Sequence, residues 1–235
     1  MRHPAPPASA PTDPSVGAPP VPLRIAALLW VLAPTVYLLA EAVAATAFDG
    51  YSYATNYISD LGVPEVGVYE GRTIDSPLAA VMNAGFLGEG VLFALAAVVA
   101  FWALPAGLAR AGFLGLAVLH WFGLSLVGLV PGSTESIEAG VAHLHVIGAG
   151  MAIVAGNLAV IVAGSRMTRW GLPRLRVPSV VLGSLGLLGL ALLLLGQNLD
   201  DPLLLGLGTW ERLAVYPFML WQLVVGIALL RRTRG

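Results

Sequence analysis

The feature that most limits how this chain can fold is a series of six apolar runs, each at least 20 residues long. An α-helix rises about 1.5 Å per residue, so roughly 20 residues cross the hydrocarbon core of a bilayer. Each run must be helical there, because lipid offers no partner for a free backbone N–H or C=O group. The runs are Ile25–Ala47, Leu78–Trp102, Leu108–Val130, Ala139–Gly164, Val177–Gly196 and Trp210–Leu230. We therefore predict an all-α fold, a polytopic bundle of six transmembrane helices within residues 23–231.

Composition supports this class of protein and excludes several others. Apolar residues make up 57% of the chain and charged residues only 11%, whereas soluble domains carry about 25% charge. A net charge of -1 argues against nucleic acid as a partner, and the lack of cysteine argues against a disulfide-stabilised secreted domain. The partners that we expect are membrane lipids.

The placement of arginine predicts the orientation of the bundle. All twelve basic residues are arginine. If the N-terminus is cytoplasmic, only Arg72 and Arg212 fall on the outer side, as the positive-inside rule requires. We predict that both termini are cytoplasmic and that the protein is a multi-pass protein of the plasma (cytoplasmic) membrane. Residues 1–22 are Pro-rich and predicted to be a disordered cytoplasmic tail, and residues 232–235 a short basic one.

The longest connection, residues 48–77, falls on the predicted outer side. A connection of this length without regular structure is usually functional, and we therefore look for function in the outer half. Its acidic residues are Asp49, Asp60, Glu65, Glu70 and Asp75.

Ionisable side chains inside the predicted spans are further candidates, because burying a charge in a membrane is costly. Glu41 lies near the outer end of the first span, Glu89 and His120 lie near mid-membrane, and His145 lies in the outer turns of the fourth. These depths are compatible with one cavity that opens outward. Glu89 is either a protonated carboxyl bonded to Asn83, His120 or a backbone carbonyl, or else a general acid or proton relay.

The sequence offers no convincing metal site. His143 and His145 are two residues apart, and such residues point about 200° apart on a helix, whereas chelation needs a spacing of three or four. His145 shares a helix face with Glu138, two turns earlier, which leaves open a site completed by a neighbouring helix. We nevertheless predict no metal ligands, and the sequence identifies no cofactor.

One stretch carries a resemblance to a known family. Residues 55–62, which read TNYISDLG, resemble the signature segment of a bacterial and archaeal membrane family called domain of unknown function 998 (DUF998). The similarity extends from about Ile25 to Leu230. Later features that agree with it are Ser76-Pro77 before Asn83 and Gly85, Gly128–Pro131 before His145 and Ala149, and Gly208–Arg212 before Trp221.

The resemblance implies a six-helix membrane protein with an outer-facing polar feature made from Ser59, Asp60, Asn83 and His145. It implies no particular reaction. The connection of residues 48–77 is longer than the loops that the resemblance leads us to expect.

Three functions remain open at this point. The first is a non-catalytic lipid-binding protein, scaffold or sensor. The alternative is a membrane-embedded enzyme that uses acid/base or metal-assisted chemistry on a lipid or isoprenoid, and the third is a small proton-coupled transporter. An enzyme requires at least three candidate catalytic side chains within about 4–6 Å of one point. The candidate catalytic residues are Asp60, Glu89, His120 and His145, and the candidate ligand-pocket residues are Glu41, Ser59, Asn83 and Glu211.

Glycine in two spans predicts close packing between helices and permits a homo-oligomer, because a residue without a side chain lets two backbones approach. These glycines are Gly183, Gly186 and Gly189 in the fifth predicted span, and Gly112 and Gly115 in the third.

Overall fold

The computed structural model describes residues 19–69, 71–199 and 204–232, and within them it has six helices long and apolar enough to cross a membrane. This confirms the predicted fold class, with boundaries that differ by a few residues. The disorder predicted for residues 1–22 falls mostly on residues outside the described part of the chain and stays a prediction. The six helices are α1 (Val21–Ala47), α2 (Ala79–Ala103), α3 (Leu108–Leu129), α5 (Ala142–Gly164), α6 (Arg176–Gly196) and α7 (Leu207–Arg231).

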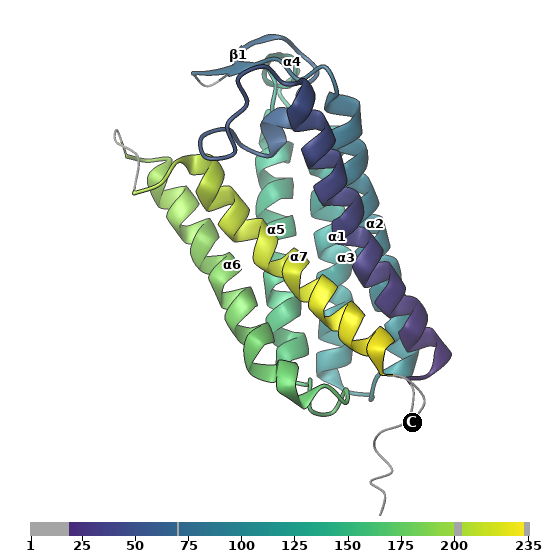
Figure 1. Cartoon of the computed structure of the whole chain (residues 1–235). Coiled ribbons are helices and arrows are strands. Elements are labelled where there is room, and N and C mark those ends of the chain that lie inside the picture. The colour runs from purple at the N-terminus through teal and green to yellow at the C-terminus, as the bar shows by residue number, and fades with distance from the viewer. Residues whose placement is uncertain (1–18, 70, 200–203, 233–235) are drawn as a thin grey trace, which may run out of the picture.

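The six helices form a closed ring (Figure 1). Each packs against the next along the chain, and α7 packs against α1 to close the ring. One end of the bundle carries the connection between α1 and α2, and we call it the cap end. The other end begins α1 and ends α7. We call it the arginine-rich end, because eight of the ten described arginines lie there: Arg24, Arg110, Arg166, Arg169, Arg174, Arg176, Arg231 and Arg232.

The connection at the cap end is folded, contrary to the expectation of a segment without regular structure. It contains a short 3₁₀ helix, η1 (Ser59–Gly62), and an antiparallel hairpin of β1 (Gly67–Tyr69) and β2 (Arg72–Ile74). Gly71 has a φ of +76° in the hairpin turn, a conformation that favours glycine. We call residues 48–78 the cap.

The fourth predicted span begins later than expected. A separate short helix, α4 (Thr134–Glu138), precedes α5, and its N-terminus is capped by the Ser133 hydroxyl, which accepts a bond from the Ser136 N–H at 3.2 Å. Gly140 then has a φ of +72°, so the chain turns before α5 begins. Apolar periodicity alone cannot detect this break. A second 3₁₀ helix, η2 (Pro173–Leu175), precedes α6.

The glycines of the third and fifth predicted spans differ in how closely other helices approach them. A Cβ at Gly183 would come within 2.6 Å of the Asn157 carbonyl oxygen of α5, and one at Gly189 within 2.5 Å of the α7 backbone. These positions therefore need glycine for close packing, as predicted. At Gly112 and Gly115, however, a Cβ would meet nothing within 4 Å. The close contact of α3 is made instead with α5, where Gly123 lies against Gly148 and Ala152.

Helix α7 is tilted across the bundle, and its tilt makes room for the cap. Near the cap end α7 lies against α6 at Gly189. Near the arginine-rich end it lies against α1, where a Cβ at Gly226 would be 2.7 Å from the Ala27 carbonyl oxygen. Figure 1 shows α1 and α7 diverging toward the cap end, with the first part of the cap lying over the space between them. The contacts that hold the cap in this position involve most of the predicted site residues.

Candidate functional site

Arg212, in the second turn of α7, joins α1, α7 and the cap. Its Nε and Nη2 donate to Glu41 Oε1 at 3.1 and 2.8 Å. Its Nη1 donates to the carbonyls of Tyr53, Asn56 and Gly208 at 2.7–3.1 Å. Both charged side chains are buried, with 1% exposure for Glu41 and 7% for Arg212. The guanidinium therefore neutralises a buried carboxylate and satisfies three carbonyls where the cap meets the bundle.

Two tyrosines complete this cluster. Tyr216 donates to both carboxylate oxygens of Glu41, at 3.0 and 2.9 Å. Tyr51, in the cap, accepts from Arg212 Nη2 at 2.6 Å and donates to the Tyr57 carbonyl at 3.1 Å. Burial raises the pKa of the Tyr51 phenol above its ordinary value, so the phenol keeps the proton that it donates.

Asp60 forms a second ion pair within the cap. Arg72 of β2 donates from Nε to Asp60 at 3.1 Å and lies over the Tyr57 ring at 4.4 Å. Asp60 also accepts from the Tyr57 N–H at 3.0 Å and from Asn56 Nδ2 at 3.3 Å. A carboxylate that accepts from both a backbone and side chains fixes the local chain path. The contacts join η1 to the hairpin.

Three further predicted residues tie the cap or the neighbouring turn to the helices. Glu211 of α7 accepts the backbone N–H of Ile58. Asn83 of α2 donates to the Gly62 carbonyl at 2.8 Å, and His145 Nδ1 donates to the Val130 carbonyl at 2.8 Å. Ser59, the first residue of η1, is half-buried beside these contacts.

A separate polar cluster lies in the middle of the bundle. Glu89 of α2 and His120 of α3 are buried, and Glu89 Oε2 lies 2.7 Å from His120 Nε2. His120 Nδ1 lies 2.7 Å from the carbonyl of Ala152, and Gln222 of α7 donates to Glu89 Oε1 at 2.7 Å. Four helices of the ring therefore contribute to this cluster.

Hydrogen-bond chemistry fixes the net charge of the Glu89–His120 pair. A carbonyl oxygen can only accept, so His120 Nδ1 must carry a proton toward Ala152. The short contact between Nε2 and Oε2 needs one further proton, which belongs either to the imidazolium or to the carboxylic acid. In both forms the pair is neutral overall, which lowers the cost of burying it in a membrane.

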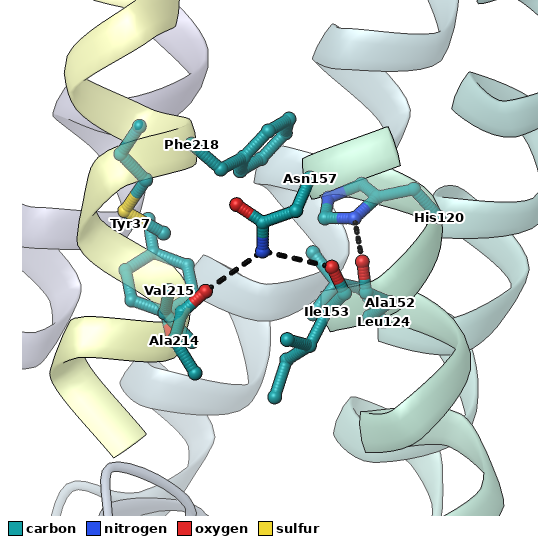
Figure 2. A pocket seen from close by; sticks show the side chains of 10 residues that line it. Tyr37, His120, Leu124, Ala152, Ile153, Asn157, Ala214, Val215 and Phe218 are labelled. Carbon is teal, nitrogen blue, oxygen red and sulfur yellow. Dashed lines mark hydrogen bonds between the residues drawn. The ribbon is translucent and has the colours of Figure 1, made fainter. Parts of the chain in front are cut away.

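A small cavity lies beside this pair, between α3, α5 and α7. Figure 2 shows His120 and Asn157 facing it with apolar neighbours such as Phe218, and Asn157 Nδ2 donating to the Ile153 and Ala214 carbonyls at 2.9 Å. The cavity volume is about 30 Å³. A single water needs roughly 10–15 Å³ on this measure, so the cavity has room for one or two waters and not for a lipid.

The cap carries a much larger cleft. Its volume is about 400 Å³, which falls in the range of small-molecule sites, roughly 300–1,000 Å³. Asp49 is exposed at this cleft. The lining residues are Phe48, Asp49, Gly50, Thr55, Asn56, Arg72 and Thr73.

The four candidate catalytic residues do not converge on one point. Glu89 and His120 are paired, but Asp60 belongs to the cap and His145 to the first turn of α5. Glu89 follows Asn83, which contacts the cap, by six residues, so it lies about 9 Å deeper along α2. Within the described part of the chain, no group of three or more His, Cys, Asp or Glu side chains is arranged to hold a metal ion.

Sequence reasoning missed Arg212, Gln222 and Asn157 as members of these clusters. The last predicted span begins at Trp210, which places Arg212 at the outer surface, whereas α7 begins at Leu207 and holds Arg212 in its second turn. The sequence does carry a signal: Glu41 needs a buried cation at its own depth, and Arg212 is one of two arginines at that end among the residues that the structure describes. Glutamine and asparagine in apolar runs give a weaker signal.

The family comparison agrees with the resemblance read from the sequence. A family model described as "Protein of unknown function (DUF998)" matches residues 31–228. No curated protein and no solved structure matches the chain.

Proposed function

The chain belongs to the DUF998 family of proteins of unknown function. From the geometry of its cavities we propose that it is a non-catalytic, lipid-binding protein of the cytoplasmic membrane. Its ligand site is the cleft in the cap. The ligand is an amine-bearing molecule, and we expect the ethanolamine headgroup of a phospholipid in the leaflet next to the cap. The positive-inside distribution of arginine makes this the outer leaflet.

The difference in volume between the two cavities carries the proposal. The cavity in the bundle measures about 30 Å³ and the cleft in the cap about 400 Å³. A headgroup therefore fits the cleft without any movement of the helices, whereas the bundle interior would first have to open. Small-molecule sites in proteins are usually formed in advance.

Arg72 lines the cleft but is paired with Asp60, so the remaining charge at the cleft, that of Asp49, favours a cationic group. Asp49 supplies an exposed carboxylate, and Thr55, Asn56 and Thr73 supply hydroxyl and amide groups around it. Phe48 adds an apolar wall next to the end of α1. Lipid headgroups reach high local concentrations at the end of a transmembrane helix, so modest affinity is enough to keep such a site occupied.

The enzyme alternative receives less support from the geometry. Asp60 and Glu41 are both paired with arginine, which leaves neither as a free acid or base. Glu89 and His120 could exchange a proton, but the space beside them is too small for a lipid or isoprenoid. Acid/base catalysis needs the reacting atom within hydrogen-bond reach of the catalytic group.

A lipid-binding assay on the purified full chain tests the proposal. Native mass spectrometry would compare retention of phosphatidylethanolamine with that of phosphatidylglycerol of the same acyl chains. Asp49→Asn removes the carboxylate and keeps the shape, and we expect it to weaken binding of phosphatidylethanolamine about fivefold, the upper value for an exposed ion pair.

Glu138→Gln is the matched control, because it removes one exposed carboxylate from the same end of the bundle outside the cleft. It should leave retention of phosphatidylethanolamine unchanged. Equal retention by the wild type and Asp49→Asn would contradict the proposed ligand site.

A further inference from the structure

A second pocket lies at the opposite end of the bundle, among the arginines. It measures about 60 Å³ and is formed by the turn between α2 and α3 and the residues that follow α5. Three arginines line it, Arg110, Arg166 and Arg169, together with the buried Trp170. The volume is several times the roughly 10–15 Å³ that one water needs.

Two of these arginines have buried donors without an acceptor. The Nε atoms of Arg110 and Arg166 are buried and make no hydrogen bond among the described residues. Arg110 is held in place by other groups: its Nη1 donates to the Leu104 carbonyl at 3.1 Å, and its guanidinium lies over the Phe101 ring at 4.1 Å. An unsatisfied donor of a charged group is costly to bury, so a missing acceptor is expected at this pocket.

The surrounding charge also favours an anion. The described residues at the arginine-rich end include eight arginines and no aspartate or glutamate. The pocket is also lined by Leu108 and Ala109 at the start of α3, and Gly107, the N-cap residue, offers these N–H groups no side-chain acceptor. The N-terminus of a helix adds a partial positive charge to that of the guanidinium groups.

Exposed apolar side chains next to the pocket indicate what carries the anion. Leu108 is 93% exposed and Trp102 79% exposed, and both lie at the ends of helices that border the pocket. In a membrane these side chains face acyl chains or the interface. A phosphate with an attached diacylglycerol would fill the pocket and cover these residues together.

We propose that this pocket binds a phosphate group, and that its occupant is the headgroup of an anionic phospholipid. Arg110, Arg166 and Arg169 bind the phosphate oxygens, since guanidinium groups are well matched to phosphate. The site is independent of the cleft in the cap and lies at the other end of the helices.

The test measures lipid retention by the purified full chain with native mass spectrometry, using phosphatidylglycerol and phosphatidylcholine of the same acyl chains. The wild type should retain phosphatidylglycerol preferentially. Arg166→Gln removes a positive charge and a guanidinium whose Nε makes no hydrogen bond within the described part of the chain. We expect it to weaken binding of phosphatidylglycerol about tenfold, the loss of one charge-assisted hydrogen bond.

Arg174→Gln is the matched control. It removes one exposed arginine from the same end, in η2, and Arg174 does not line the pocket. Its effect should be clearly smaller, because exposed charges are screened at physiological salt. Equal losses in the two variants would overturn the proposal, since they would show general attraction to a basic surface. Melting temperatures of both variants in detergent separate a binding defect from misfolding. Arg169→Gln is a second test of the pocket, because Arg169 lines it but is exposed, so this variant should weaken binding of phosphatidylglycerol without lowering the melting temperature.

A third arm uses inorganic phosphate in place of lipid. We expect millimolar phosphate to leave phosphatidylglycerol bound. If millimolar phosphate instead displaces the lipid from the wild type, the pocket is a site for free phosphate, and the lipid is overturned as its occupant. Retention of phosphatidylethanolamine through the cap should not change in Arg166→Gln, which distinguishes failure of this proposal from failure of the cleft in the cap.

Discussion

The cap end and the middle of the bundle both bury a carboxylate, but they neutralise it with different partners. At the cap end Glu41 pairs with Arg212, whose guanidinium is charged at every accessible pH. In the middle of the bundle Glu89 pairs with His120, which can hold or release a proton. The cation of the first pair never releases its proton, whereas the second pair can be either an ion pair or two uncharged groups, depending on which partner holds the shared proton.

The difference follows from depth and from connectivity. The arginine at the cap end also donates to three carbonyls of the cap and α7, so its charge is distributed over many acceptors near the membrane surface. At mid-depth the helix carbonyls already accept from their own helix, and the pair there gains only a second bond to one of them, the Ala152 carbonyl that accepts from His120. A partner that can become neutral is therefore the less costly choice there. The comparison predicts that breaking the Glu41–Arg212 pair lowers the free energy of unfolding more than breaking the Glu89–His120 pair.

The largest effect is expected for Arg212→Gln. The variant leaves Glu41 buried without its cation and removes donors from the carbonyls of Tyr53, Asn56 and Gly208. We expect a loss of about 3–5 kcal/mol in the free energy of unfolding, the usual cost of breaking a buried ion pair. Thermal and denaturant unfolding in detergent would measure it.

The double variant Glu41→Gln/Arg212→Gln provides the control. Removing both charges should recover part of the loss, because no buried charge is then left alone. If the losses in free energy of unfolding measured for Glu41→Gln and Arg212→Gln simply add in the double variant, the two side chains do not stabilise each other. That result would contradict the role of the ion pair at the cap end.

A medium effect is expected for Gly208→Ala. A Cβ at this position would overlap the Asn56 carbonyl oxygen and lie 2.9 Å from that of Tyr53, so the cap would have to move away from α7. Overpacking of this kind costs about 1–3 kcal/mol. Gly112→Ala is the matched control, because its Cβ would meet nothing within 4 Å. Equal melting temperatures for the two variants would show that the cap does not need close contact with α7.

The smallest effect is expected for Glu89→Gln. The amide can still accept from Gln222 and donate to His120 Nε2, while His120 Nδ1 continues to donate to Ala152. We expect a loss of about 1 kcal/mol, typical of one altered hydrogen bond. Destabilisation as large as that of Arg212→Gln would mean that the charge on Glu89 is essential to the fold. Unfolding measured under the same detergent conditions decides between these outcomes.

The six helices could be predicted because their signal is local. A run of about 20 apolar residues is readable without knowing its neighbours. The hairpin in the cap gave no such signal, since β1 and β2 are only three residues each and are joined at Gly71. Arg72 of β2 also pairs with Asp60 of η1, a contact between two short segments that periodicity cannot reveal.

The site residues could be chosen by type but not grouped. Ionisable side chains are rare in a membrane span, which marks Glu89 and His120 as candidates, and the sequence offers His120 as one of three possible partners for Glu89. Which helices face each other depends on rotation about each axis, and a single sequence does not contain that information. Glu41 and Arg212, which are joined in the structure, can be matched from the sequence by depth and charge but not by the helix faces that meet.

The pairing of the first helix with the last has a consequence for how the protein is made. Glu41 and Arg212 are 171 residues apart. A ribosome adding about 5–20 residues per second needs roughly 10–30 s to reach the arginine after the glutamate has left the active centre. During that interval Glu41 has no arginine to pair with, and the cap has no α7 to pack against. The ring can therefore close, and the cap can take its final position, only after the last helix has entered the membrane.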